Sequence, residues 1–157
     1  MEAAQIYERL KERFGGKILD LKVGAGDPVI EVEKGAIAEV AAYLKGDPEL
    51  GFDTLMCLSG VDYEKAKTFA VAYHLFSFKH RHKITLKVQT PKEEPTFPTV
   101  EGVWKAANWF EREAYDLYGI IFSGHSDLRR ILLPEDWEGH PMRKDWKYPE
   151  TYRGVPL

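Results

Sequence analysis

Three β-type segments in the middle of the chain constrain its fold more than any other feature. The first, TLMCLSGVDY (54–63), is a continuous apolar run, and FAVAYHLFSF (69–78) and HKITLKV (82–88) follow it closely. A continuous apolar run predicts a strand buried on both faces. The basic turn around residues 79–81 predicts that the second and third segments are neighbouring strands. The centre of the fold is therefore expected to be a β-sheet.

Helical and hairpin patterns flank these strands. Apolar residues recur at helical spacing over residues 3–14 and again over 36–45, and the short β-type runs within 17–34 predict a hairpin. After a proline-rich loop, Thr99 is expected to cap a long helix that ends near Gly119. This order predicts an α+β fold in two layers, with helices packed on a mixed, mostly antiparallel sheet.

The last part of the chain shows neither helical nor strand periodicity. Prolines recur there from Pro134 to Pro156. We therefore expect a single α+β domain at residues 1–133, followed by an extended C-terminal arm at residues 134–157 that docks on a partner. A tail folded back on its own domain is the alternative.

Composition narrows the possible functions. The 157 residues, 44% hydrophobic and 30% charged, are typical of a soluble globular domain. With a net charge of −3, the chain lacks the broad positive field that attracts nucleic acids and anionic membranes, so neither is an expected partner. No apolar stretch reaches the roughly 18 residues that span a bilayer, so membrane association is expected only through a partner. Cys57, in an apolar context, is expected to be a buried, inert thiol.

Charged residues in the predicted long helix offer one possible catalytic site. Glu113 and Asp116 lie three residues apart and share a helix face, as a carboxylate pair for acid–base chemistry requires. Arg112 lies four residues before Asp116, however, and this spacing favours a local ion pair. We therefore expect these charges to be structural or to belong to an interface.

Histidines offer a possible metal site. His125 and His140, with Asp127, would serve a stand-alone metal hydrolase, but their spacing fits no compact zinc pattern. His80 and His82 lie in a basic turn that repels cations, and we expect them at the surface. Phosphate-binding loops and nucleophile elbows are absent from the sequence. No catalytic, metal-binding or cofactor-binding residue is predicted in this chain, and the hydrolase stays as an alternative.

One long segment is informative in another way. The sequence EREAYDLYGIIFSGHSDLRRILLPEDWEGHPMRKDW (111–146), preceded by LSGVDY (58–63), resembles the signature of the C subunit of the proton-translocating NADH–quinone oxidoreductases, bacterial relatives of respiratory complex I. One departure is Ser126, which stands where the family pattern usually has proline.

The resemblance implies a peripheral-arm protein that has no cofactor of its own. It would pack against the D subunit, which holds the quinone site, near the cluster-bearing subunits B and I, on the cytoplasmic side of the inner membrane. Flavin mononucleotide, iron–sulfur clusters, NADH and quinone would bind elsewhere in the complex. The chain would scaffold electron transfer from NADH to quinone coupled to proton translocation. The equivalent subunit of an energy-converting hydrogenase, or of another complex I-like assembly, is the alternative.

The resemblance also implies which residues meet the partner. We call residues 124–146 the strap, because they are expected to dock on the quinone-site subunit. Arginine and tryptophan, frequent in the strap, are enriched among interface hot spots, and interleaved acids and bases suit interfacial ion pairs. The candidate interface residues are Glu111, Arg112, Glu113, Asp116, His125, Asp127, Arg129, Arg130, His140, Pro141, Arg143, Lys144, Asp145 and Trp146.

Overall fold

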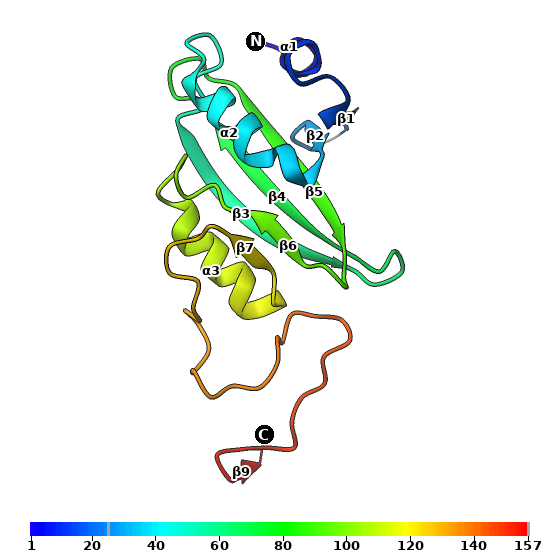
Figure 1. Cartoon of the computed structure of the whole chain (residues 1–157), viewed down its shortest axis with the longest axis vertical. Helices are drawn as coiled ribbons and strands as arrows, with labels where there is room; N and C mark the ends of the chain where they lie inside the picture. Colours follow the sequence, from blue (N-terminus) through cyan, green and yellow to red (C-terminus); the bar gives the residue numbers. More distant parts are fainter. Residues whose placement is uncertain (25, 157) are drawn as a thin grey trace.

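A five-stranded sheet forms the centre of the molecule (Figure 1). The computed structural model describes residues 1–24 and 26–156. The sheet has the strand order β1-β2-β5-β4-β3, and β2 and β5 run parallel while the other neighbouring pairs are antiparallel. Its strands are β1 (Ile18–Lys22), β2 (Val29–Val32), β3 (Thr54–Tyr63), β4 (Thr68–Phe76) and β5 (Lys83–Pro91). The expected mixed, mostly antiparallel sheet and the hairpin at residues 17–34 are confirmed.

Helices form the second layer. These are α1 (Ala3–Phe14), α2 (Ile37–Gly46) and α3 (Ala107–Tyr118), with short 3-10 turns at Gly15–Lys17 and Lys34–Ala36. In Figure 1, α2 lies across one face of the sheet, and α3 lies nearer the C-terminal end of the molecule beside β3. Ile6 and Leu10 of α1 and Val40 and Leu44 of α2 are fully buried in the same core as Tyr73 of β4. The two-layer α+β fold is confirmed.

Strand β3 corrects one expectation. It lies at the edge of the sheet and pairs with β4 alone among the described residues. Only Leu55, Leu58 and Asp62 of this strand are buried, so it is not buried on both faces. Met56 is 45% exposed and Cys57 is half-buried, so the expectation of a buried thiol is also wrong. An irregularity in the register between Leu55 and Cys57 breaks the alternation of buried and exposed side chains.

Helix α3 begins later than its sequence suggests. Residues 99–106 form turns, and the helix starts at Ala107. Thr99 does not cap it. Its end at Gly119 is as expected, because Gly119 adopts a left-handed conformation with φ 72°, which terminates helices. A Cβ atom at this position would also lie 2.7 Å from the His140 ring, so both the backbone and the available space require glycine.

The chain after α3 has little regular structure. Strand β7 (Ile121–Ser123) pairs in parallel with β6 (Thr96–Pro98), and a small hairpin of β8 (Thr151–Tyr152) and β9 (Val155–Pro156) ends the described part. Figure 1 shows the intervening segment as an irregular loop beyond the C-terminal end of α3. It returns to the sheet at Lys144, whose N–H bonds to Asp62 of β3. Within the arm, Arg153 pairs with Asp136 at 2.8 Å. No helix of the described residues is long and apolar enough to cross a membrane.

Candidate subunit interface

Asp116 holds the middle of the strap on the domain. Its fully buried carboxylate accepts a hydrogen bond from Arg130 Nη1 at 2.7 Å. The other carboxylate oxygen accepts the backbone N–H groups of residues 131–133 at 2.8 to 3.1 Å. Burial opposes ionisation of Asp116, but the hydrogen bonds from Leu133 and Arg130, together with the others, lower its pKa below the ordinary value. The chain therefore winds around one ionised carboxylate.

Arg112 binds the same stretch from the other direction. Its Nε and Nη2 donate to the carbonyl oxygens of Arg129 and Arg130 at 3.1 and 2.9 Å. The expected ion pair between Arg112 and Asp116 is wrong, because both side chains bind the strap, and Asp116 pairs with Arg130 instead. Glu113 is exposed whereas Asp116 is buried, so they form no paired-carboxylate site.

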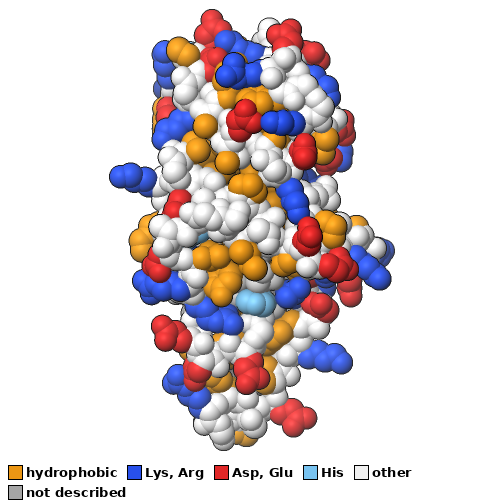
Figure 2. Space-filling view, viewed as in Figure 1, with side chains coloured by type: hydrophobic (Ala, Val, Ile, Leu, Met, Phe, Trp, Pro, Cys, Tyr) orange, Lys and Arg blue, Asp and Glu red, His pale blue; other side chains and the backbone are white. Residues whose placement is uncertain are grey.

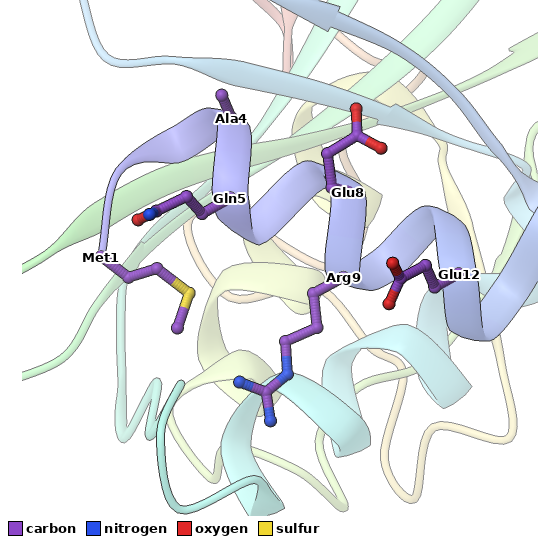
Figure 3. Close-up of a pocket in the computed structure, with 6 residues that line it drawn as sticks. All are labelled: Met1, Ala4, Gln5, Glu8, Arg9 and Glu12. Carbon is purple, nitrogen blue, oxygen red and sulfur yellow. The ribbon is translucent and has the colours of Figure 1, made fainter.

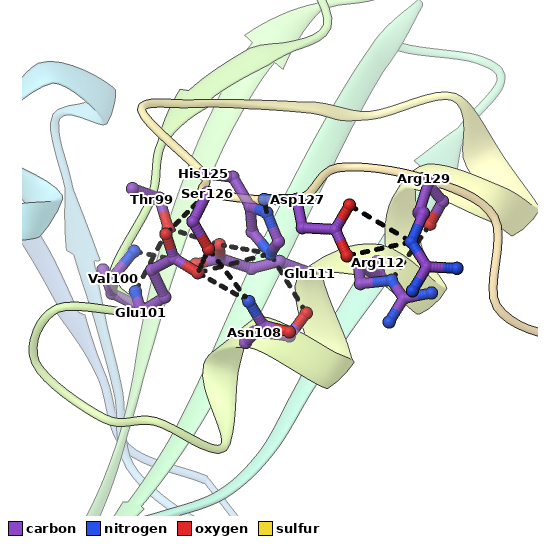
Figure 4. Close-up of polar contacts among 10 residues, drawn as sticks. All are labelled: Thr99, Val100, Glu101, Asn108, Glu111, Arg112, His125, Ser126, Asp127 and Arg129. Atoms are coloured by element: carbon purple, nitrogen blue, oxygen red, sulfur yellow. Dashed lines mark hydrogen bonds and ion pairs between the residues drawn. The ribbon is translucent and has the colours of Figure 1, made fainter.

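Glu111 is a second buried carboxylate on α3, N-terminal to Asp116 by more than one helical turn (Figure 4). The hydroxyl group of Thr99 donates to it at 2.5 Å and the N–H of Val100 at 2.7 Å. Burial raises the pKa of Glu111 to about 7, and these two hydrogen bonds and the nearby His125 only partly oppose that rise. Thr99, expected to cap the helix, therefore binds a carboxylate inside it.

His125 fixes the first turn of the strap. Its buried ring accepts the N–H of Asp127 through Nδ1 at 3.0 Å, so Nε2 carries the proton and donates to the carbonyl oxygen of Asn108 at 3.1 Å. Beside it, Glu101 accepts the N–H of Ser126 at 2.6 Å. Figure 4 shows these groups converging between α3 and the strap. Both ring nitrogens are engaged within the chain.

The second half of the strap crosses the end of α3. His140 Nδ1 donates to the carbonyl oxygen of Asp116 at 2.9 Å, and the N–H of Met142 donates to that of Leu117 at 3.0 Å. Pro141, between them, is half-buried. Sequence reasoning assigned these residues to a partner interface, but their contacts in this chain first fix the strap to its own domain.

Asp62 anchors the far end, and sequence reasoning gave it no role. It lies on β3, its side chain is fully buried, and Oδ2 accepts the N–H of Lys144 at 2.9 Å. Lys92 Nζ lies 2.6 Å from Oδ1 in an ion pair whose geometry departs from that of a hydrogen bond. An aspartate inside an apolar strand was the available signal, because a buried carboxylate needs partners.

Most of the remaining candidate residues are exposed, and Arg143 and Trp146 are half-buried. Asp127 and Arg129 are exposed and pair with each other at 2.8 Å, a contact that contributes little to stability. Trp146 is half-buried, and its indole N–H donates to the carbonyl oxygen of Glu138 at 3.3 Å. The exposed candidate side chains are those of Glu113, Asp127, Arg129, Lys144 and Asp145. Their interface role stays a prediction.

Apolar side chains are exposed beside these charges. Trp109 on α3 is 60% exposed, and Leu132 and Met142 on the strap are 62% and 49% exposed. In the view of Figure 2, hydrophobic side chains gather at the level of α3, and acidic and basic side chains alternate below them. Exposed apolar side chains rimmed by charges are typical of surfaces that meet another protein.

The structure does not assemble the alternative metal site. His125 bonds to Asn108 and His140 to Asp116, positions about 12 Å apart along a helix. Within residues 1–24 and 26–156, no group of three or more His, Cys, Asp or Glu side chains could hold a metal ion. His82, expected at the surface, is buried instead, with Nε2 donating to the carbonyl oxygen of Leu50 at 2.6 Å, because its ring packs on Phe52.

The molecule also has a surface hollow away from the strap, along α1 (Figure 3). Arg9 projects from this helix toward the loop after α2, where it pairs with Asp47 at 3.0 Å. The hollow is lined by Met1, Ala4, Gln5, Glu8, Arg9 and Glu12. None of these belongs to the strap or to its anchors, so this hollow gives no reason to place the functional site there.

A family model and three named sequence relatives of the chain point to one family. The family model described as respiratory-chain NADH dehydrogenase, 30 kDa subunit, matches residues 30–152. Proteins named as the C subunit of NADH-quinone oxidoreductase are 45% identical in Chloroherpeton thalassium, over 96% of this chain and 63% of that protein, and 40% identical in Chlorobium phaeobacteroides, over 99% and 95%. A third, from a Roseiflexus species, is 46% identical over 92% of this chain and 84% of its own length.

Two solved structures are similar in fold to this chain. A trypsin-resistant fragment of Nqo5 superposes with a TM-score of 0.66 at 31% identity, over 79% of this chain and 99% of the fragment. A chain of the membrane-bound sulfane sulfur reductase, an archaeal respiratory membrane complex, gives a TM-score of 0.76 at 21% identity, over 94% and 86%, and supports the fold alone. Because the family model spans most of the chain and close relatives cover nearly all of it, the chain belongs to the respiratory-chain NADH dehydrogenase 30 kDa subunit family, the family of the C subunit of NADH–quinone oxidoreductase.

Proposed function

We propose that this chain is a peripheral-arm subunit of an NADH–quinone oxidoreductase and that its strap docks on the quinone-site subunit. The observation that carries the proposal is the way the strap is held. Buried carboxylates of Asp116 and Asp62 fix a segment without regular structure, while Leu132, Met142 and Arg129 point outward. A segment fixed before binding loses less conformational entropy on association, which favours a docking surface.

In this role the chain supplies a surface and no redox group. Electrons would pass from NADH through flavin mononucleotide and iron–sulfur clusters on other subunits, B and I among them, to quinone, with proton translocation in the membrane part. The buried charged side chains of α3 support the assignment of the redox groups to other subunits. Glu111, Arg112 and Asp116 are used in binding backbone groups of their own chain. The chain would lie on the cytoplasmic side of the inner membrane and reach it only through its partners.

A second assembly is the competing proposal. The equivalent subunit of an energy-converting hydrogenase, or of another complex I-like assembly, would present a similar surface. Relatives at 40 to 46% identity are named as the C subunit of NADH-quinone oxidoreductase, which favours the first proposal. The likeness to the archaeal sulfane sulfur reductase bears on the fold alone.

Affinity purification of the tagged chain from its native membranes tests this function. We expect mass spectrometry to recover the quinone-site subunit together with flavin- and cluster-bearing subunits, and the eluate to oxidise NADH with quinone. Recovery of a hydrogenase large subunit would instead assign the chain to the sister assembly. Isolation of the chain alone, with stoichiometric bound metal, would reject the scaffold function.

Two tagged variants test whether recovery of the quinone-site subunit depends on the anchored strap. Asp116→Ala removes the central anchor, and we expect it to recover less of the quinone-site subunit. Glu12→Ala removes an exposed carboxylate from α1, away from the strap, and serves as the matched control for loss of a charge. Equal recovery of that partner with wild type and Asp116→Ala would show that the anchored strap is not the docking surface.

A further inference from the structure

Arg143 is the unusual charged group of the strap. Its guanidinium donates no hydrogen bond to any residue of the described chain, although Nε is buried and the side chain is only 28% exposed. Asp145 forms an ion pair with Nε at 3.7 Å, which is beyond hydrogen-bond distance, and its carboxylate is itself 61% exposed. Buried polar groups in native proteins are nearly always hydrogen-bonded, so an unpaired buried N–H in this position calls for a partner.

Other arginines of the same region are satisfied within the chain. Arg112 donates to carbonyl oxygens of the strap, and Arg130 donates to Asp116 and to the carbonyl oxygens of Trp137 and Gly139. Even the exposed guanidinium groups of Arg129 and Arg153 each bind a carboxylate of this chain. Within residues 111–156, Arg143 is the one arginine whose guanidinium donates no hydrogen bond to the chain.

The guanidinium of Arg143 is also held in place. It lies 5.0 Å from the ring centroid of Phe69, a fully buried side chain of β4. The next residue, Lys144, is fixed through its N–H on Asp62. The ion-pair partner of Asp62 is Lys92, at 2.6 Å, and not Arg143. A guanidinium already oriented on an aromatic face loses little freedom when it binds an anion.

We infer that Arg143 is a preformed receptor for a carboxylate of the partner on which the strap docks. This inference rests on the proposed function. The planar fork of a guanidinium matches the two oxygens of an aspartate or glutamate side chain, and the fork here has donors to spare. Lys144 and Lys147, both exposed, add positive charge beside it. The partner surface facing this end of the strap is therefore acidic.

The decisive experiment compares affinities for the native quinone-site subunit, purified and immobilised, using the full chain. We expect Arg143→Gln to weaken binding at least about thirtyfold, as the loss of one member of a buried charged pair does. Arg143→Lys keeps the charge and the contact with Phe69 but lacks the fork, and we expect about a tenfold loss. Arg13→Gln changes an exposed arginine on α1 and should bind as the wild type does.

Each outcome has a separate meaning. If wild type binds the quinone-site subunit and both Arg143 variants bind within threefold of it, the receptor is rejected while the proposed function stands. If wild type does not bind that partner, the proposed function fails and the receptor fails with it. Hydrogen exchange of the Lys144 amide checks that the strap keeps its place. Should Arg143→Gln accelerate that exchange, Arg143→Lys decides the question.

A free anion could satisfy the same donors, and a titration separates this source from a partner carboxylate. Sodium acetate is added to the isolated wild-type chain while the NMR signal of the Arg143 Nε–H group is followed. We expect only weak, non-saturating shifts below about 50 mM, since a single exposed ion pair has little affinity. Saturation at low millimolar acetate, together with unchanged affinity of Arg143→Gln for the quinone-site subunit, would overturn the inference.

Discussion

Asp116 on α3 and Asp62 on β3 hold two points of one irregular segment by the same means. Asp116 accepts the backbone N–H groups of residues 131–133, and Asp62 accepts the N–H of Lys144. Both carboxylates are fully buried, and each has a basic partner, Arg130 for the first and Lys92 for the second. The segment between them is therefore fixed at both ends without forming a helix or a strand.

Removal of the first anchor should destabilise the whole domain. Asp116→Ala leaves Arg130 and three backbone N–H groups without their acceptor, and breaking a buried ion pair from one side costs about 3–5 kcal/mol. Urea unfolding measures this free energy. Glu113→Ala, on the exposed side of the helix, should stay within about 0.5 kcal/mol of wild type. Equal effects of the two variants would contradict the role given to Asp116.

Removal of the second anchor should act locally. Asp62→Ala frees the N–H of Lys144, so we expect its hydrogen exchange to accelerate by about tenfold or more. The N–H of Met142 bonds to the carbonyl oxygen of Leu117 and serves as the internal control, with a smaller change. An unchanged rate at Lys144 would show that the strap is held there by other contacts.

Glu111 should make stability depend on pH near neutrality. Burial raises its pKa to about 7 in the folded state, against 4.5 for the unfolded chain. The folded state therefore binds more protons between these values, and stability falls as the pH rises from 4.5 through 7. The full difference is about 3 kcal/mol, at about 1.36 kcal/mol per pKa unit.

Unfolding free energies at about pH 5 and about pH 8 test this dependence. Wild type should lose stability between the two values, and Glu111→Gln, which carries no titrating proton, should lose much less. Asp116, whose pKa is lowered, does not contribute in this window, because its titration lies below the ordinary carboxyl range. A pH dependence that survives in Glu111→Gln would assign the effect to another group.

Gly119 should resist substitution more than another glycine of the same region. Gly119→Ala places a methyl group 2.7 Å from the His140 ring and keeps a positive φ of 72°. We expect a loss of about 1–3 kcal/mol in thermal or urea unfolding. Gly102, with open space around its Cβ position and no positive φ, is the control and should tolerate alanine. Similar losses at both positions would contradict this account.

Local patterns predicted the elements of the fold well, because they depend on neighbours in sequence. The helices at 3–14 and 37–46 and the hairpin that follows the first of them bury the residues that their periodicity indicates. Strand β3 was misjudged, since an apolar run does not reveal how much of each face of a strand other elements will cover. The start of α3 was misjudged because Thr99 had a distant partner, Glu111, in place of the helix N-terminus.

The candidate site was only partly predictable for a related reason. Spacing along a helix placed Arg112 and Asp116 on one face, but it could not show that each would bind backbone groups well beyond the helix, in residues 129–133. The resemblance to a family indicated that the strap docks on a partner, but it did not indicate which side chains fix the strap to its own domain. The role of Asp62 depends on a contact across 82 residues of sequence, which no local pattern encodes.

Asp116 and Asp62 bind backbone N–H groups of the strap. The path of the strap therefore does not depend on which side chains it carries at those positions. Any residue except proline offers the same N–H at positions 131–133 and 144. Leu132 and Lys144 can therefore be exchanged for other side chains while the path of the segment is kept. Such a segment can change its chemistry in step with a changing partner at little cost to its own folding.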